Sequence, residues 1–257
     1  MNFHHTLRRL LVTGMSGSGK TALVIRLIKA HCHTWLFIFD PEREFSIKLG
    51  LPVSTHPIDL ARRAGQGKPV AFDPSAMFPG DLESGFSFFC KWILDFSRMQ
   101  VDGRPVVNGP KLFVADELQN FTQTGKGGIS KEFAELLNQG RRQEIDTIFS
   151  SQAPNFVHQQ IRLQATELFT LHHEDQSVLD WLSPDFDPVA VRSLAVPGGF
   201  LHKRRFAVAH AKGKPDRVPA RRSQEPKRDR GGIEAVRVDG GISPAKRTPE
   251  KVRPIDR

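Results

Sequence analysis

The residues from Gly14 to Thr21 read GMSGSGKT and could hold the phosphates of a nucleotide. They fit the pattern G-x-x-x-x-G-K-[ST], in which backbone N–H groups and a helix N-terminus surround the phosphates. We expect Lys20 to reach the β- and γ-phosphates and the Thr21 hydroxyl to ligate Mg²⁺. The predicted cofactors are therefore ATP and Mg²⁺, and the predicted binding residues of this loop are Gly14, Met15, Ser16, Gly17, Ser18, Gly19, Lys20 and Thr21.

Two adjacent carboxylates, Asp116 and Glu117, follow four apolar residues in the segment KLFVADE. Such a run is typical of a strand that ends at the carboxyl edge of a parallel sheet, where ligands bind. We expect Asp116 to hold Mg²⁺ through water and Glu117 to act as general base on the attacking water. The alternative is an ordinary strand that ends in two solvated acids. An acidic pair favours hydrolysis over phosphate transfer to a small acceptor.

A third polar residue, Gln152, ends the strand-like segment IFSSQ. In a triphosphatase, a polar side chain on this strand would lie between the γ-phosphate and the acid pair. Gln152 could then hydrogen-bond the attacking water or sense the product. The alternative is a strand-end residue that faces solvent.

Residues 1–210 alternate strand-like apolar runs with helical patterns, which favours an α/β fold with a mostly parallel central sheet flanked by helices. At least one strand separates the strands of the two motifs, so we predict a P-loop NTPase of the additional-strand, catalytic-glutamate type. The segments GGFLHK and RFAVAHA suggest a C-terminal hairpin. The predicted strands are 7–14, 34–40, 69–73, 111–117, 146–152 and 167–173, and the predicted helices are 21–31, 82–96 and 130–142.

The net charge of +9 is concentrated at the C-terminus. Residues 211–257 hold 14 Lys and Arg against 7 Asp and Glu, whereas residues 1–210 are near +2. No aromatic residue follows Phe206, so this segment has little apolar surface to offset its ordering entropy. We predict two units, a P-loop ATPase motor domain at 1–210 and a disordered basic tail at 211–257. The tail either attracts nucleic acid phosphates or is simply solvated.

Composition argues against a disulfide-stabilised or membrane-spanning protein. There are two cysteines, and the longest apolar stretch, around Phe86 to Phe96, is interrupted by Lys91 and Asp95. The first residues run directly into a predicted strand, which leaves no room for a cleaved signal peptide. We therefore expect a cytoplasmic protein without a transmembrane segment.

The sequence resembles the FtsK–HerA group of DNA-pumping ATPases across nearly all of residues 7–210. Besides GMSGSGKT and FVADE, the resemblance rests on FIFDPEREF (37–45) and GRRQEIDTIFSSQAPNFVH (140–158), and on ELFTLHHEDQSVLDWL (167–182) and PGGFLHKRRF (197–206). The chain lacks the N-terminal barrel of HerA proper and the membrane segments of FtsK proper and of Zot-like phage assembly proteins. It is most similar to the genome-packaging ATPases of internal-membrane-containing icosahedral viruses.

The resemblance implies an ATP-hydrolysing translocase of double-stranded DNA that works as a ring, most simply a hexamer, with ATP bound between subunits. It also implies a host-cytoplasmic or virion-associated protein that docks on a capsid or membrane-vertex protein. Arg141 and Arg142 are candidate transition-state stabilisers, within a subunit or across the interface, or they face solvent. Glu44 could position groups near the γ-phosphate or be a plain surface carboxylate. Two other functions stay open, a nucleotide-switched ATPase of a secretion, conjugation or filamentous-phage assembly machine, and a small-molecule kinase.

Overall fold

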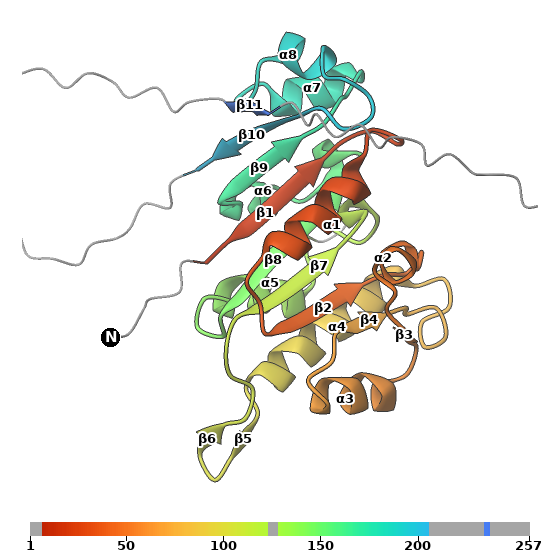
Figure 1. Cartoon of the computed structure of the whole chain (residues 1–257), viewed down its shortest axis with the longest axis vertical. Coiled ribbons are helices and arrows are strands. Elements are labelled where there is room, and N and C mark those ends of the chain that lie inside the picture. The colour runs from red at the N-terminus through yellow and green to blue at the C-terminus, as the bar shows by residue number, and fades with distance from the viewer. Residues whose placement is uncertain (1–6, 123–127, 206–233, 237–257) are drawn as a thin grey trace, which may run out of the picture.

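The computed structural model describes residues 7–122, 128–205 and 234–236 of the chain. Within these residues the central element is a nine-stranded sheet (Figure 1). The strands from β9 to β3 run parallel, and β10 and β11 extend one edge in antiparallel fashion. This confirms the predicted mostly parallel α/β fold. In sheet order the strands are β11 (Glu234–Val236), β10 (Phe200–Arg204), β9 (Glu167–Thr170), β1 (Arg9–Thr13), β8 (Ile145–Ser151), β7 (Lys111–Ala115), β2 (Trp35–Phe39), β4 (Val70–Phe72) and β3 (Val53–Ser54).

The order of the central strands brings the predicted motifs together. Strand β8 lies between β1, which precedes the glycine loop, and β7, which precedes the acid pair. Thr13 is in register with Ser151, and Ala115 is in register with Phe149, so the three strands end at one edge of the sheet. One strand therefore separates the two motifs, which confirms the predicted additional-strand arrangement.

Helices cover both faces of this sheet (Figure 1). Helices α1 and α2 pack on one face, and α3 to α7 pack on the other. No helix among the described residues is long and apolar enough to span a bilayer. The helices are α1 (Lys20–Ala30), α2 (Glu44–Leu49), α3 (Pro57–Gly65), α4 (Leu82–Ser97), α5 (Lys131–Gln139), α6 (Gln159–Gln164), α7 (Gln176–Leu182) and α8 (Pro188–Arg192), with 3₁₀ turns at Leu118–Asn120 and Pro154–Phe156.

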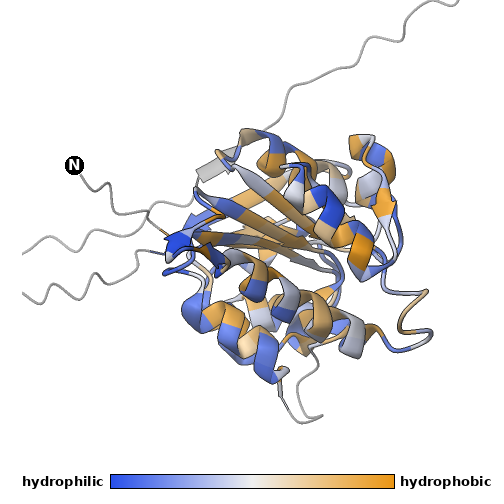
Figure 2. Cartoon of the chain, turned by 90° about the horizontal axis from the view of Figure 1, so that it is seen from below, coloured by the Kyte–Doolittle hydropathy of each residue, from blue (hydrophilic) through white to orange (hydrophobic). Residues whose placement is uncertain are grey.

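Side chains that alternate along the strands form a separate core on each face. In β2, for example, Leu36 and Ile38 join the core under α1, whereas Phe37 and Phe39 join the core under α4. This alternation follows from the two-residue repeat of a strand. Because both faces of the sheet are covered, the central strands are largely hydrophobic along their length (Figure 2). The sheet is thus fixed from both sides, which gives the loops at its edge a rigid base.

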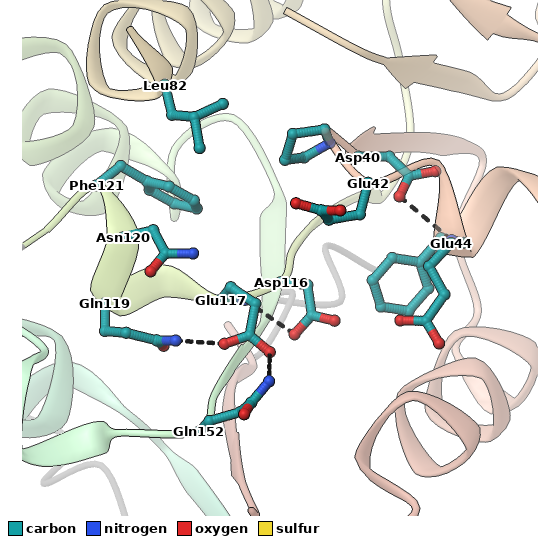
Figure 3. A pocket seen from close by; sticks show the side chains of 12 residues that line it. Asp40, Glu42, Glu44, Leu82, Asp116, Glu117, Gln119, Asn120, Phe121 and Gln152 are labelled. Carbon is teal, nitrogen blue, oxygen red and sulfur yellow. Dashed lines mark hydrogen bonds between the residues drawn. The ribbon is translucent and has the colours of Figure 1, made fainter. Parts of the chain in front are cut away.

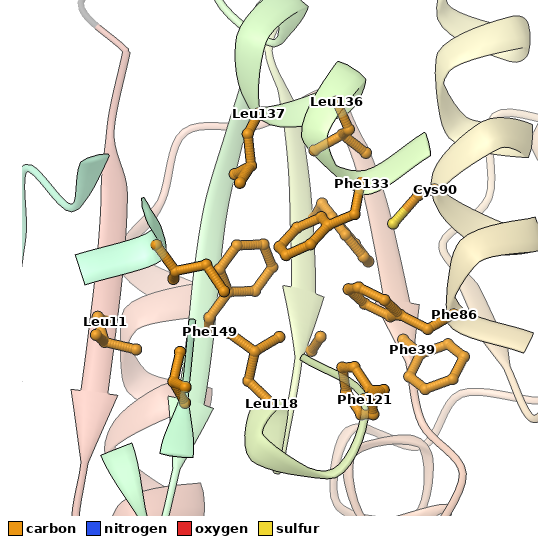
Figure 4. Packing of buried hydrophobic residues seen from close by; sticks show 14 of the residues in the cluster. Leu11, Phe39, Phe86, Cys90, Leu118, Phe121, Phe133, Leu136, Leu137 and Phe149 are labelled. Carbon is orange, nitrogen blue, oxygen red and sulfur yellow. The ribbon is translucent and has the colours of Figure 1, made fainter. Parts of the chain in front are cut away.

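The larger core also anchors the segment that follows the acid pair (Figure 4). Leu118 is fully buried, and the ring of Phe121 lies 4.3 Å from that of Phe86 between centroids. Phe86 in turn contacts Phe133 edge to face. The 3₁₀ turn after Glu117 is therefore held by buried Leu118 at its start and by the aromatic contacts of Phe121 at its end.

The C-terminal strands differ from the predicted hairpin. Strand β10 pairs with β9, and the expected second strand, RFAVAHA, lies outside the described residues except for Arg205. On its other side β10 pairs with β11, which comes from the predicted disordered tail. An edge strand exposes unpaired backbone groups, and residues 234–236 satisfy them. The prediction of a disordered tail therefore does not hold for these three residues, and the rest of the tail lies outside the described part of the chain.

Several short elements have no counterpart in the sequence-based prediction. Between β2 and β4 the chain adds α2, β3 and α3, and after α4 it forms a separate hairpin of β5 (Gln100–Val101) and β6 (Arg104–Pro105). The hairpin turns through Asp102 and Gly103, both with positive φ. It projects from the body of the molecule, on the opposite side from the glycine loop (Figure 1).

Candidate nucleotide-binding and catalytic site

The predicted phosphate loop, Gly14–Thr21, connects β1 to α1. Gly17 and Gly19 have φ values of +75° and +97°, which other residues rarely adopt. The N–H groups of Gly14 and Met15 donate to the carbonyls of Ser151 (3.3 Å) and His172 (3.2 Å), which fixes the loop to the ends of β8 and β9. Ser18 is buried behind the loop. A cavity of about 280 Å³ opens in front of it, and the loop residues that line this cavity are Met15, Ser16, Gly17, Gly19, Lys20 and Thr21.

Lys20 joins the loop to the acid pair. Its ammonium group donates to Asp116 Oδ1 and Glu117 Oε1, at 2.8 Å each, and its side chain is 6% exposed. Burial lowers the pKa of Lys20, but the charges and hydrogen bonds of Asp116 and Glu117 outweigh burial, so the pKa is raised above its usual value. Lys20 is therefore a fixed cation at the floor of the cavity, where a phosphate group would displace the carboxylates as its partner.

The end of β7 holds the acid pair in a constrained geometry. Asp116 Oδ1 accepts hydrogen bonds from the Ser150 hydroxyl and from the Glu117 N–H, the latter at 2.9 Å. Glu117 has φ 50° and ψ 46°, the left-handed region, which is unfavourable for a residue with a side chain. Strain of this kind is concentrated at functional sites, where surrounding contacts maintain it. The backbone turn directs the Glu117 carboxylate toward the cavity rather than into the core.

Three side chains hold the Glu117 carboxylate, and Figure 3 shows two of them, Gln119 and Gln152. Oε1 accepts from Lys20 and from Gln152 Nε2, the latter at 2.5 Å. Oε2 accepts from Gln119 Nε2, and the other end of that amide, Oε1, accepts from the Ser151 hydroxyl at 2.5 Å. The structure thus places Gln152 beside the acid pair, as its position at the end of the additional strand predicts.

A second cavity, of about 600 Å³, adjoins the first and shares Glu44, Glu117 and Gln152 with it. Leu82 and Phe121 form its apolar side (Figure 3). None of the described residues that line this second cavity is a lysine or arginine. Five carboxylates line it, those of Asp40, Glu42, Glu44, Asp116 and Glu117. Lys20 pairs with Asp116 and Glu117 and Lys48 pairs with Glu44, so the carboxylates outnumber the lysines that pair with them.

Glu44 lies at the exposed rim of this site, where its Oε1 also pairs with Lys48 one helical turn later. It is the first residue of α2, and its Oε2 accepts a hydrogen bond from the Thr21 hydroxyl at 3.1 Å. Asp40 fixes the start of α2 by accepting from the N–H groups of Phe45 (3.2 Å) and Ser46 (2.7 Å). The carboxylate of Glu44 therefore lies against the residue that is predicted to ligate Mg²⁺.

Solved structures share this fold, although no protein-family model and no curated protein matches the sequence. One is the genome packaging NTPase B204 from Sulfolobus turreted icosahedral virus 2 in complex with AMPPCP. It is 20% identical over 77% of this chain and 92% of that chain, with a TM-score of 0.54. Its complex with AMP covers the same shares at 19% identity and a TM-score of 0.57. A further structure, titled the DNA-packaging ATPase from Sulfolobus Turreted Icosahedral Virus, is 18% identical with a TM-score of 0.53.

The chain has the fold of a P-loop NTPase. Within this fold, the residues present fit a Mg²⁺ ion that is bound together with nucleotide. Mg²⁺ prefers hard oxygen ligands and is commonly held by one or two carboxylates, substrate phosphates and water. The hydroxyl of Thr21 and the carboxylate of Asp116 are such ligands, and the cation of Lys20 already lies between the two carboxylates. Thr21 and Asp116 are therefore the residues that would hold the ion.

Arg141 and Arg142 lie far from the phosphate loop of their own chain. Helix α5 ends at Gln139, and both arginines are exposed in the turn that leads to β8. That turn lies at the amino ends of the strands, since the Lys111 N–H donates to the carbonyl of Glu144 just before β8 begins. At about 3.3 Å per strand residue, the turn is about 20 Å from the catalytic edge. The within-subunit role is therefore wrong, and the role across a subunit boundary stays a prediction.

Three residues that contact the acid pair or its partners were not predicted from the sequence. They are Gln119, which binds Glu117, and Ser150 and Ser151, which bind Asp116 and Gln119. The serines had a usable signal, because they immediately precede Gln152 at the end of a strand that neighbours β7. The role of Gln119 depends on the turn at Leu118–Asn120, which no local pattern indicates.

Proposed function

We propose that the chain hydrolyses ATP at the edge of the sheet formed by β1, β7 and β8. The observation that carries this proposal is the position of Lys20, whose ammonium group is 2.8 Å from both Asp116 and Glu117. A phosphate-binding cation and an acid pair thus meet at one point, beside a cavity lined by the glycine loop. Hydrolysis requires both parts together, because the phosphate must be held where the attacking water is activated.

In the proposed mechanism each residue has a separate task. Lys20 moves from the acid pair to the β- and γ-phosphates. Thr21 and Asp116 would hold Mg²⁺, which would neutralise charge on the phosphate oxygens. Glu117 accepts the proton of the attacking water as general base. Gln152, which is 2.5 Å from Glu117 Oε1, orients that water. Glu44 restrains Thr21 by accepting a hydrogen bond from its hydroxyl.

We infer that hydrolysis is coupled to the movement of double-stranded DNA, as in viral genome packaging. The similarity in fold to a packaging NTPase and the basic tail support this inference. The tail of +7 would attract the DNA backbone without reading its sequence. In this role the protein would act in the host cytoplasm or at the virion, docked on a capsid or membrane-vertex protein.

A ring of identical subunits, most simply a hexamer, would complete the site. Even with Lys20 and Lys48 counted, the five carboxylates of the second cavity and the added charge of ATP leave an excess of negative charge. Mg²⁺ offsets only part of this charge, so we propose that a second copy of the chain supplies a cation. Arg141 and Arg142 are suited to this role, because they are exposed at the opposite edge of the sheet and can only reach the site of another copy.

The test of this function is phosphate release from ATP and Mg²⁺, measured with and without duplex DNA. Hydrolysis that duplex DNA stimulates would support a DNA motor. Hydrolysis that ignores DNA would favour an ATPase of a secretion, conjugation or phage-assembly machine. Absence of hydrolysis under both conditions, in a protein that binds ATP, would contradict the proposal.

A further inference from the structure

We propose that Gln119 and Ser151 act as a positioning relay for the catalytic carboxylate of Glu117. This inference deepens the proposed function and rests on it. Gln119 does not contact the phosphate loop in the structure; its amide lies between Glu117 Oε2 and the Ser151 hydroxyl. Its contribution is therefore to hold the general base in place rather than to bind nucleotide.

The chemistry of the three groups fixes the direction of the relay. An ionised carboxylate can only accept hydrogen bonds, so Gln119 must present its NH₂ group to Glu117. The carbonyl oxygen of the amide then faces Ser151, whose hydroxyl donates at 2.5 Å. Ser151 is fully buried on β8, and it cannot turn to solvent for another acceptor. A rigid strand thus sets the orientation of the amide, and the amide sets that of the carboxylate.

The residues around Gln119 hold the turn that carries it in place. The preceding residue, Leu118, is fully buried, and Phe121 packs against Phe86 at the end of the same turn. The backbone of Glu117 is in the left-handed region, and Gln119 is the residue of its own segment that holds its carboxylate. The relay therefore compensates for a strained backbone at the residue that must be placed most accurately.

The relay matters most when nucleotide binds. In the structure Lys20 and Gln152 occupy Oε1 of Glu117, whereas Gln119 occupies Oε2. Once Lys20 transfers to the phosphates, its place on Oε1 becomes available to the attacking water, beside Gln152. Gln119 continues to hold Oε2, so the carboxylate keeps its orientation through the exchange. A misplaced general base can cost up to about a hundredfold in rate, which sets the scale of the expected effect.

The test combines Gln119→Leu with Glu117→Gln and measures both ATP affinity and kcat. Gln119→Leu should lower kcat by about ten- to a hundredfold and leave the Kd for ATP within about twofold. In the Glu117→Gln background the same change should have no further effect on kcat, because there is no longer a base to position. Ser151→Ala should also lower kcat and leave the Kd for ATP unchanged. Gln159→Leu, the same change at an exposed position on α6, is the matched control and should match the wild type.

Two results would overturn the relay. One is a wild-type kcat for Gln119→Leu, and the other is an equal loss of kcat from Gln119→Leu in the presence and absence of Glu117. Failure of the proposed function has a different signature, because then the wild type itself would not release phosphate or Glu117→Gln would release it at the wild-type rate. Circular dichroism of each variant at the assay temperature distinguishes lost positioning from lost folding.

Discussion

Lys20 and Glu117 form an ion pair with 2.8 Å between Nζ and Oε1, although 96 residues separate them along the chain. The pair joins the start of α1 to the segment that directly follows β7. The cation expected to bind phosphate therefore directly contacts the carboxylate expected to act as general base. Nucleotide must break this contact to be bound, and the same contact keeps both groups within reach of the γ-phosphate.

Removal of this cation should abolish tight nucleotide binding. We expect Lys20→Ala to raise the Kd for ATP by about ten- to a hundredfold, because the loss of a hydrogen bond to a charged group usually costs that much affinity. Titration of ATP binding by calorimetry measures the change. Lys29→Ala, an exposed lysine in the last turn of the same helix, is the matched control. Equal affinities of Lys20→Ala and wild type would exclude the loop as the nucleotide site.

The arginine turn should act only between subunits. We expect the double variant Arg141→Ala, Arg142→Ala to bind ATP normally and hydrolyse it about 10³-fold or more slowly. Mixing it with Lys20→Ala should restore part of the activity, since intact sites of one variant then meet intact arginines of the other. Arg62→Ala, an exposed arginine on α3, is the control and should have no effect. If the mixture is no more active than its components, the turn is not the donor.

Oligomeric state provides an independent check on the same idea. Light scattering during turnover should report a species larger than the monomer, and dilution that dissociates this species should abolish hydrolysis. Full activity in a strictly monomeric sample would contradict a shared site.

The basic tail should dominate non-specific DNA binding. Each neutralised phosphate contributes about −0.9 to the slope of log K against log salt, so deletion of residues 211–257 should flatten this slope by several units. Basal ATP hydrolysis should persist, because every catalytic candidate lies at or before Gln152. Fluorescence anisotropy with labelled duplex at several salt concentrations measures the slope. An unchanged slope would mean that the tail is merely solvated.

The deletion also removes β11, so a second variant is needed. Replacing the eight Lys and Arg residues of 211–230 with Gln retains residues 234–236 and removes most of the positive charge. This variant should show the flattened slope with wild-type stability. A loss of hydrolysis in the deletion but not in the Gln variant would assign the pairing of β11 with β10 a role in the fold.

His173 should make the folded chain sensitive to acid. Burial and the nearby charge of His172 lower the pKa of His173 to about 4. The charge of Asp175 opposes this shift but is the smaller effect. An unfolded histidine has a pKa near 6.5, so the unfolded state takes up the proton first. The contribution of neutral His173 to the free energy of unfolding is fully present above about pH 6.5. It declines as the pH falls toward 4, by up to about 3 kcal/mol.

Urea unfolding of the wild type and of His173→Leu between pH 7 and pH 4.5 should show this loss in the wild type and not in His173→Leu. His56→Asn, at an exposed histidine, should behave as the wild type; an equal acid loss in His173→Leu would contradict the assignment.

Much of the fold and part of the site could be predicted because they depend on local patterns. The apolar runs that became β1, β2 and β7 are nearly continuous and easy to recognise, because these strands are buried on both faces. The phosphate loop is recognisable because its backbone geometry requires glycine at fixed positions. Strands of two residues, such as Val53–Ser54, carry no periodicity and could not be predicted.

What could not be predicted depends on tertiary register. The pairing of Gln119 with Glu117 requires a 3₁₀ turn that aromatic packing holds in place, and the pairing of β11 with β10 joins segments about thirty residues apart. The position of Arg141 and Arg142 was available from topology, however. A turn that joins a helix to the next parallel strand must lie at the amino edge of the sheet, opposite the phosphate loop.

The most direct test of the central claim is the rate of ATP hydrolysis by Glu117→Gln, measured in a single turnover after ATP binding has been verified. The change keeps the size of the side chain and removes only its ability to accept a proton. We expect ATP to bind with near wild-type affinity and to be hydrolysed roughly 10²–10⁴-fold more slowly. Hydrolysis at the wild-type rate by the ATP-bound variant would contradict the assignment of Glu117 as general base and, with it, the proposed site.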